Sequence, residues 1–373
     1  MTDVTQKFVG VMSSGDPRSP ELWSATPFNI IQALEERDWK VMAVDGSKLL
    51  SEQQPLEGAA DKNKLQLMLR GVRNQFKIRQ LGQAAAARIR VLPPEYKKII
   101  HLHAFSYLPV VGATPGRKHY LIIDSTSHTW SRYTAFQSAR ASHLVADYLA
   151  KRIYQQMEHI FAIGEYVRDD LIQHYGMSPD KVTAIGTGLG VIKPYFGNKN
   201  YYNGMILTVA KERFNEKGTD LLVASFRLAQ KKSPLLRLKI VGESFLQLET
   251  EGLTNAEITG FLSEEALQQC FEEAALFAMP ARNEPWGLVY LEALSCKTPI
   301  LGLKRNAIPE LTADGRYGFM VAEPTPENVG KTLLDACSDR EKLVSMGEEG
   351  QARCLNHYTW DKVALRIEEV LLN

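Results

Sequence analysis

Two glutamates, Glu284 and Glu292, flank the start of an expected helix in the segment of this sequence best suited to bind a ligand. A strand pattern ends a few residues before Glu284, and the helix begins near Gly287. The first-turn N–H groups of Gly287, Leu288 and Val289 have no partner within the helix, and glycine lets a ligand approach the backbone. An anion rich in oxygen, such as a diphosphate, fits that helix end.

The two glutamates can take different roles beside such an anion. Glu284, on the loop, can meet a sugar hydroxyl or a partial positive charge next to the phosphates. Glu292, about one and a half turns into the helix, can hold both hydroxyls of a ribose. Neither is expected to contact phosphate, because like charges repel. The alternative is that Glu284 is a helix-start acid favoured by the helix dipole and that Glu292 is a solvated helix residue.

A loop with three cations, Lys211, Arg213 and Lys217, follows the apolar run at residues 206–209. Lys217 and the glycine after it open a helical pattern. Fixed positive charges aimed at a diphosphate would offset the charge that builds on it as a leaving group. For this loop the alternative is a solvated surface turn.

The elements that must position these residues follow a regular order. Short apolar runs alternate with longer helical patterns, which predicts βαβ units and two doubly wound parallel sheets. In the first half the expected strands are residues 8–12, 41–44, 99–102, 120–123, 160–163 and 182–185. In the second half they are residues 206–209, 238–241, 257–259, 276–279, 299–302 and 319–321. Residues 186–204, rich in Gly, Pro and Asn, predict a linker. A helix around 326–355 and an amphipathic helix over 360–372 are expected to end the chain.

Size and composition agree with two globular domains. The 373 residues exceed the length at which one core stops growing. Hydrophobic residues make up 45% and charged residues 23%, and the net charge of +1 gives no overall attraction to nucleic acid or membrane. No apolar run approaches the roughly 20 residues that span a bilayer, and no secretory signal pattern is expected. The cysteines lack zinc or redox spacing and are expected to be reduced, mostly buried thiols: Cys270, Cys296, Cys337 and Cys354.

The segment from Glu284 to Glu292 resembles the mark of the large retaining glycosyltransferase family 4. That mark is a glutamate, a short Phe-Gly-Leu-like turn and a second glutamate eight positions on; here Trp286 fills the aromatic slot. Residues 306–321 are similar to the family's "Glu … Asp-Gly … Gly-Phe-hydrophobic" continuation. The resemblance covers most of the chain and is weakest between residues 45 and 95.

The resemblance implies an α/β protein of the GT-B type, in which two Rossmann-like doubly wound parallel-sheet domains face each other across a cleft. We expect an acceptor-side N-terminal domain at residues 1–195, with the boundary near residue 195, and a nucleotide-sugar-binding domain at 196–355. A terminal helix within residues 356–373 can cross back to the N-terminal domain.

Roles for the cations come from the same resemblance. The family has an Arg or Lys just after the strand and a Lys before a glycine. Lys217 matches the second position, and either Lys211, which the register favours, or Arg213, which would offer a bidentate fork, matches the first. These residues would clamp the diphosphate of a donor and assist its departure.

The resemblance also implies how the rest of the donor is bound. Glu284 would position the sugar, Glu292 the ribose, and the helix start at Gly287 the diphosphate. The base would lie against the backbone near Gly260 and Phe261.

The N-terminal domain matches the family less closely. Gly15 and Thr26 resemble the family's glycine-bearing loop near the donor, but its paired glycines are absent, and an ordinary turn and helix cap are the alternative. Where the family often has a histidine that touches the donor sugar, this sequence has Asp124, followed four residues later by His128. Asp124, His128 or neither can take that role.

A basic stretch lies in the region of weakest resemblance. Residues 62–98 contain ten Lys and Arg against one acid, Glu95, with apolar side chains interleaved. An amphipathic basic stretch can lie on an anionic membrane at about 1 kcal/mol per nearby cation. A solvated basic face, or an acceptor groove for a phosphate-bearing substrate, is the alternative.

The sequence therefore predicts a retaining glycosyltransferase that moves a sugar from a nucleoside-diphosphate sugar to a glycan, a lipid-linked or a small-molecule acceptor. No Asp-x-Asp triplet ends a strand, so neither a metal nor another cofactor is expected. No nucleic-acid partner is expected, and the location would be cytoplasmic, with or without peripheral contact at the inner face of the membrane. The alternatives are a nucleotide-sugar epimerase or a phosphorylase on the same fold, or a non-catalytic sugar-nucleotide-binding subunit.

Overall fold

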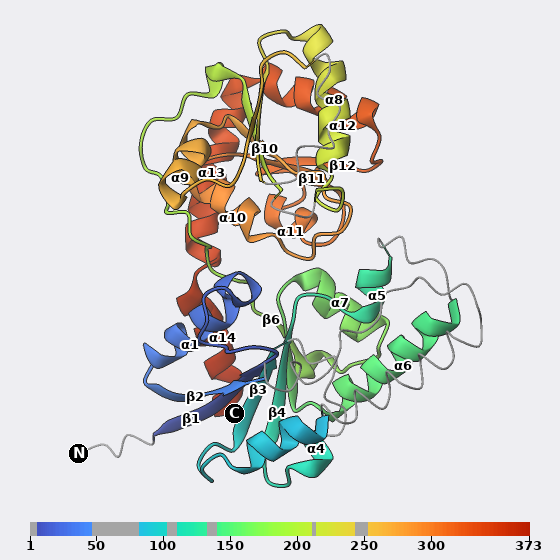
Figure 1. The fold of residues 1–373 in the computed structure, drawn as a ribbon, viewed down its shortest axis with the longest axis vertical. Coiled ribbons are helices and arrows are strands. Elements are labelled where there is room, and N and C mark those ends of the chain that lie inside the picture. The colour runs from blue at the N-terminus through green and yellow to red at the C-terminus, as the bar shows by residue number, and fades with distance from the viewer. Residues whose placement is uncertain (1–5, 47–81, 103–109, 133–139, 211–213, 243–252) are drawn as a thin grey trace.

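Two parallel sheets, one in each half of the chain, form the framework of the protein. The computed structural model describes residues 6–46, 82–102, 110–132, 140–210, 214–242 and 253–373. Figure 1 shows two domains, one above the other, with each sheet covered by helices.

The sheet of the N-terminal domain has the order β2-β1-β3-β4-β5-β6, with every neighbouring pair parallel. Its strands are β1 (Lys7–Ser13), β2 (Trp39–Asp45), β3 (Lys98–Leu102), β4 (Lys118–Ile123), β5 (His159–Ala162) and β6 (Val182–Ala184). The described helices are α1 (Thr26–Glu35), α4 (Val110–Ala113), α5 (Ser127–Ser131), α6 (Arg140–Gln156) and α7 (Glu165–Gln173).

The sheet of the C-terminal domain has the order β12-β11-β10-β7-β8-β9 and is also parallel. Its strands are β7 (Met205–Val209), β8 (Arg237–Val241), β9 (Ala256–Thr259), β10 (Leu276–Ala278), β11 (Ile300–Leu303) and β12 (Gly318–Val321). Its helices are α8 (Thr219–Lys232), α9 (Glu264–Glu273), α10 (Leu288–Ser295), α11 (Ile308–Thr312), α12 (Pro326–Ser338) and α13 (Arg340–His357), and α14 (Trp360–Leu372) ends the chain. Each of the strands expected from the sequence is present.

The expectation of one helix over residues 326–355 was wrong, because Asp339 divides it into α12 and α13. The Asp339 carboxylate accepts the backbone N–H of Lys342 at 3.0 Å and so caps the second helix. Thr359 caps α14 in the same way, through the N–H of Lys362 at 3.3 Å. A side-chain acceptor satisfies amides that have no partner within the helix, which explains where these helices begin.

The last helix, α14, contacts α1 of the N-terminal domain, where Figure 1 shows it beside that helix. Its apolar side chains, among them Ile367 and Leu371, belong to a hydrophobic cluster that also contains Val9 and Ile30. The same cluster includes Trp286 of the C-terminal domain, so buried apolar contacts run continuously from one domain to the other.

Candidate functional site

The loops that carry Lys217 and Glu284 leave neighbouring strands at the centre of the second sheet. The chain proceeds outward from β7 to β9 on one side and from β10 to β12 on the other, so the strand order reverses between β7 and β10. Ligands of open α/β sheets bind beyond the carboxyl ends of the strands at such a reversal. The β7 loop leads to Lys217 and the β10 loop to Glu284, which places both residues at this point.

Lys217 and Glu284 form an ion pair across the two loops, and both side chains are largely buried. The loops are joined on either side of this pair. Arg282 forms a bidentate contact with Asp220 at 2.6 and 2.7 Å, and its backbone N–H donates to the Glu216 carbonyl at 2.8 Å. The structure thus brings together two site residues that lie 67 positions apart in the sequence.

The start of α10 lies where the sequence predicts. Gly287 caps the helix with a φ of 79°, a backbone conformation that favours glycine. Leu288 and Val289, half-buried, form the first turn, whose amides have no partner within the helix. Because Asn306 donates to the Glu284 carbonyl at 3.0 Å, the loop before the helix is held in place.

Glu292 is buried, with only 8% of its surface exposed, so the alternative of a solvated helix residue is wrong. One carboxylate oxygen accepts the backbone N–H of Val191, in the linker between the domains, at 3.0 Å. A side chain on Gly190 would collide with the same carboxylate. The close packing of the linker against Glu292 was not predicted, since nothing in the linker's composition indicates which helix it touches.

Tyr166, which the sequence analysis missed, links the predicted sites of the two domains. Its hydroxyl donates to the carbonyl of Asp124 at 2.6 Å. A Cβ on Gly164 would lie 3.1 Å from the ring of Trp286, so the start of α7 packs against the loop that bears Glu284. Burial raises the pKa of Tyr166 well above its ordinary value, and the negative charges of Asp124 and Glu284 raise it further.

A second contact between the domains lies beside Tyr166. The Glu310 carboxylate, on α11, accepts the backbone N–H of Glu165, the first residue of α7, at 2.8 Å. Burial raises the pKa of Glu310 to about 7, although that hydrogen bond and nearby arginines partly offset the rise. The sequence did not predict this contact. The spacing of apolar residues indicates helices and strands, but not that a carboxylate of one domain caps a helix of the other.

Asp124 and His128 occupy different environments. Asp124 directly follows β4, accepts the hydroxyl of Ser125 at 2.9 Å, and sits at the Tyr166 contact described above. His128 is held on α5 by Asp170, at 2.6 Å between its Nδ1 and the carboxylate. Of the two candidates, Asp124 is the one whose backbone joins the contact between the domains.

The remaining donor-binding candidates lie after strands or, for Thr26, at a helix start. Gly15 follows β1, and its carbonyl accepts the backbone N–H of Gly46 at 3.3 Å. Thr26 is buried as the first residue of α1. Gly260 and Phe261 follow β9, and 56% of Phe261 is exposed. Lys211, Arg213 and most of the basic stretch lie outside the described residues.

Two buried histidines of the N-terminal sheet form a hydrogen-bonded chain with Thr114. His101, on β3, pairs with His119 at 2.8 Å, and His119 reaches the hydroxyl of Thr114 at 2.8 Å. The Thr114 hydroxyl donates to the carbonyl of Val110 at 2.7 Å, so His119 must donate to Thr114 and His101 to His119. Burial lowers the pKa of His101 to about 3 and that of His119 to about 4, which keeps both rings neutral.

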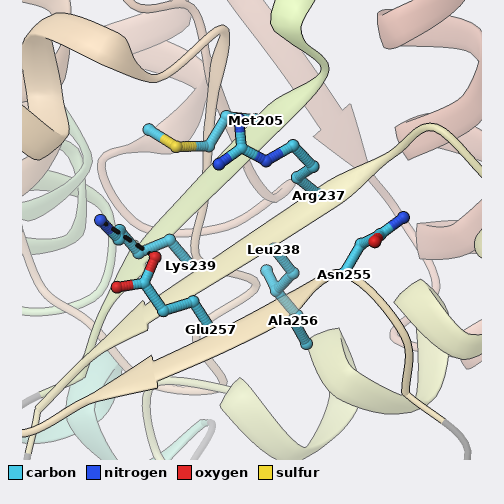
Figure 2. Close-up of a pocket in the computed structure, with 7 residues that line it drawn as sticks. All are labelled: Met205, Arg237, Leu238, Lys239, Asn255, Ala256 and Glu257. Atoms are coloured by element: carbon cyan, nitrogen blue, oxygen red, sulfur yellow. Dashed lines mark ion pairs between the residues drawn. The ribbon is translucent and has the colours of Figure 1, made fainter.

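A surface hollow in the C-terminal domain lies away from these residues (Figure 2). It is lined by Met205, Arg237 and Ala256, which begin β7, β8 and β9, and by an ion pair between Lys239 and Glu257 at 3.2 Å. These are the amino ends of the strands, whereas Lys217 and Glu284 follow the carboxyl ends. The hollow is therefore no part of the candidate site.

Two doubly wound parallel-sheet domains, with polar loops at the carboxyl ends of their strands, define the GT-B class of proteins. Comparison with protein families assigns each half. Residues 28–190 match the model "Glycosyltransferase Family 4", and residues 197–353 match "Glycosyl transferases group 1". Together the two matches cover most of the chain, which belongs to glycosyltransferase family 4.

Individual relatives are distant. The chain is 28% identical to the D-inositol 3-phosphate glycosyltransferase of Segniliparus rotundus over 215 residues, which cover 52% of this chain and 47% of that protein. The curated relatives it matches are thus only partly covered. The fold matches sucrose-phosphate synthase from Thermosynechococcus elongatus with a TM-score of 0.71 at 15% identity, over 98% of both chains. It also matches Anabaena HepE in complex with UDP, with a TM-score of 0.67 at 17% identity, over 98% of this chain and 99% of that one.

None of the helices in the described ranges combines the length and apolar composition needed to cross a lipid bilayer. Cys270, Cys296 and Cys354 are buried and Cys337 is half-buried, all as free thiols. The expectation that most of the cysteines are buried is confirmed.

Proposed function

We propose that this protein is a retaining glycosyltransferase of the hexosyltransferase type, which transfers a sugar from a nucleoside-diphosphate sugar to a sugar or lipid-linked acceptor. The observation that carries the proposal is the meeting of Lys217 and Glu284 at the reversal of strand order, next to the open amides at Gly287. A cation, a carboxylate and unpaired N–H groups at one place suit a diphosphate joined to a sugar.

In the proposed reaction the diphosphate rests on the amides of α10 and on Lys217, with Lys211 or Arg213 as the second cation. As the bond from the sugar to the diphosphate breaks, these positive groups stabilise the negative charge on the leaving oxygen. Glu284, released from Lys217 by the incoming diphosphate, accepts hydrogen bonds from the sugar. Retention follows if the acceptor attacks on the face from which the diphosphate departs.

Glu292 is proposed to bind the ribose. Its carboxylate also accepts the backbone N–H of Val191 in the linker, so the ribose would lie next to the linker. Gly260 and Phe261 are proposed to support the base, and Gly15, Thr26 and Asp124 to close the site from the N-terminal domain. No metal or other cofactor is required in this scheme, because the cationic groups supply the charge. Membrane contact through residues 62–98 stays a prediction, to be tested with anionic vesicles.

The proposal is tested by calorimetric titration of UDP, GDP and ADP into the wild type and two variants. Lys217→Ala should weaken binding of the preferred nucleotide by about tenfold or more, since a charge-assisted hydrogen bond contributes roughly 1.5–3 kcal/mol. Glu292→Gln should weaken it less. Lys231→Ala, at the exposed end of the same helix α8, is the control and should bind normally. Unchanged affinity in both site variants contradicts the assignment.

Turnover separates the remaining alternatives. A transferase consumes the donor faster when an acceptor panel is added, and chelation of divalent metal should not slow it. An epimerase converts the donor with no acceptor present, a phosphorylase would show the absorbance of pyridoxal phosphate, and a non-catalytic subunit would bind the donor without turnover.

A further inference from the structure

Gly190 and Val191, in the linker between the domains, lie directly against the carboxylate of Glu292. The carboxylate oxygen Oε1 accepts the backbone N–H of Val191 at 3.0 Å. A Cβ at position 190 would lie 3.0 Å from Cδ of Glu292 and closer still to Oε1, so any side chain there must displace the carboxylate or the linker. The φ of Gly190 lies outside the left-handed region, so the carboxylate, and not the backbone conformation, requires glycine at this position.

The position of Glu292 on α10 places it beside the proposed diphosphate site. Helical side chains lean toward the N-terminus, onto the residues three and four positions earlier. For Glu292 these residues are Val289 and Leu288, which form the first turn of the helix and supply its open amides. The Val191 N–H uses one of roughly four lone-pair positions of a carboxylate, so the group can accept further hydrogen bonds.

Two further hydrogen bonds fix the linker next to α10. The indole N–H of Trp286, in the loop just before the helix, donates to the hydroxyl of Thr187 at 2.7 Å, and both side chains are buried. Trp360, at the start of α14, donates to the carbonyl of Leu189 at 2.9 Å. The linker therefore has a defined place relative to the donor loop, which allows the N–H of Val191 to orient a side chain of α10.

We propose that Gly190 is a positioning residue: it leaves the space in which the Val191 N–H holds the Glu292 carboxylate toward both hydroxyls of a ribose. This inference rests on the proposed function and specifies its donor as a ribonucleoside diphosphate sugar, in preference to a deoxyribose form. A carboxylate that is already oriented loses less freedom when the nucleotide binds. A nucleotide without the hydroxyls would cover the carboxylate and supply no hydrogen-bond donor, and this penalty discriminates against it.

Calorimetric titration of UDP and of its dideoxy form, which lacks both ribose hydroxyls, tests the inference; the GDP or ADP pair is used if either binds better. The wild type should bind the ribose form at least about tenfold more tightly, the usual effect of hydrogen bonds to a charged group. Gly190→Ala should reduce this ratio to about threefold or less, by weakening the ribose form while the affinity for the dideoxy form changes by less than about twofold. Gly112→Ala is the matched control and should keep the wild-type ratio, since a Cβ at position 112 meets no atom within 4 Å.

A second variant, Val191→Pro, removes the N–H without adding a side chain at position 190. It should lower the ratio in the same way, and it decides the question if Gly190→Ala does not fold. A wild-type ratio in the folded variants overturns the inference, and so does an equal loss of affinity for both nucleotides, which a purely structural role would produce. Equal binding of the two nucleotides by the wild type also overturns it, whereas absence of any nucleotide binding contradicts the proposed function.

Discussion

Among the described residues, two of the contacts between the domains use glutamate in opposite ways. In the α14 contact, Glu368 accepts Lys7 at 2.7 Å, Arg37 at 2.6 and 2.8 Å and Trp39 at 3.0 Å, all from the N-terminal domain. In the α7 contact, Glu310 accepts a single backbone N–H, that of Glu165. The first contact is dense and strongly charged, and the second is sparse.

The pKa values of the two carboxyl groups reflect this difference. Burial alone would raise the pKa of Glu368, yet the hydrogen bonds from Lys7, Arg37 and Trp39 lower it below its ordinary value. Glu310 is half-buried and accepts one hydrogen bond, and desolvation raises its pKa to about 7. The comparison predicts that the α14 contact is the more stable of the two and that the α7 contact, which borders the candidate active site, is the weaker one.

The largest effect is expected from Glu368→Ala, which breaks the α14 contact. Removal of the carboxylate leaves Lys7 and Arg37 partly buried without their acceptor, and loss of one partner of a buried ion pair destabilises by roughly 3–5 kcal/mol. Urea denaturation followed by tryptophan fluorescence should show a loss near the lower end of that range. Glu369→Ala, exposed on the same helix, should change stability by less than about 0.5 kcal/mol. Equal stability of the two variants would refute the comparison.

A pair of glycine substitutions compares packing at the two contacts. A side chain on Gly188 would collide with the ring of Trp360, at the start of α14. A Cβ on Gly164 would lie 2.9 Å from Tyr166 and 3.1 Å from Trp286, in the α7 contact. Overpacking costs about 1–3 kcal/mol, and Gly188→Ala should fall near the top of that range and Gly164→Ala near the bottom.

The rate of donor turnover should rank the two variants in the opposite order from their stability, with the larger loss of rate in Gly164→Ala. Gly164→Ala should slow turnover more than its small loss of stability explains, because it disturbs the approach of α7 to the loop with Glu284. If thermal unfolding shows a smaller loss of stability for Gly188→Ala than for Gly164→Ala, the prediction that the α14 contact is the more tightly packed of the two is wrong.

The smallest effect is a pH dependence confined to the α7 contact. The pKa of Glu310 is higher in this contact than in water, so the closed form binds more protons. Closure is therefore favoured below the ordinary glutamate value and weakens as the pH rises through about 7. The radius of gyration from X-ray scattering should increase between about pH 5.5 and 8.5.

Glu310→Gln should remove that dependence, since the amide stays neutral, whereas Glu323→Gln, which is exposed, should keep it. The α14 contact should respond in the reverse direction. The pKa of Glu368 is lowered, so its stabilisation is present above the ordinary glutamate value and is lost only as the pH falls through the lower, folded-state value. A radius that is constant with pH in the wild type would count against a contact that opens.

The sequence determined the two sheets because each strand is a short run of apolar residues bounded by turn residues, and that signal is local. It also determined that α10 begins at Gly287 after a loop with Glu284, because glycine at a helix start and a preceding strand lie within a few positions. It did not predict that Asp339 ends one helix and starts the next, although an aspartate cap is a local signal too.

Only the tertiary structure decided which distant groups meet. The pairing of Lys217 with Glu284, the hold of Glu292 on Val191, and the capping of α7 by Glu310 each join residues far apart in the chain. The spacing of apolar residues in the sequence does not predict such contacts, because they depend on how the sheets twist and how the domains pack against one another. The same holds for His128, whose ring contacts the carboxylate of Asp170, 42 positions away in the chain.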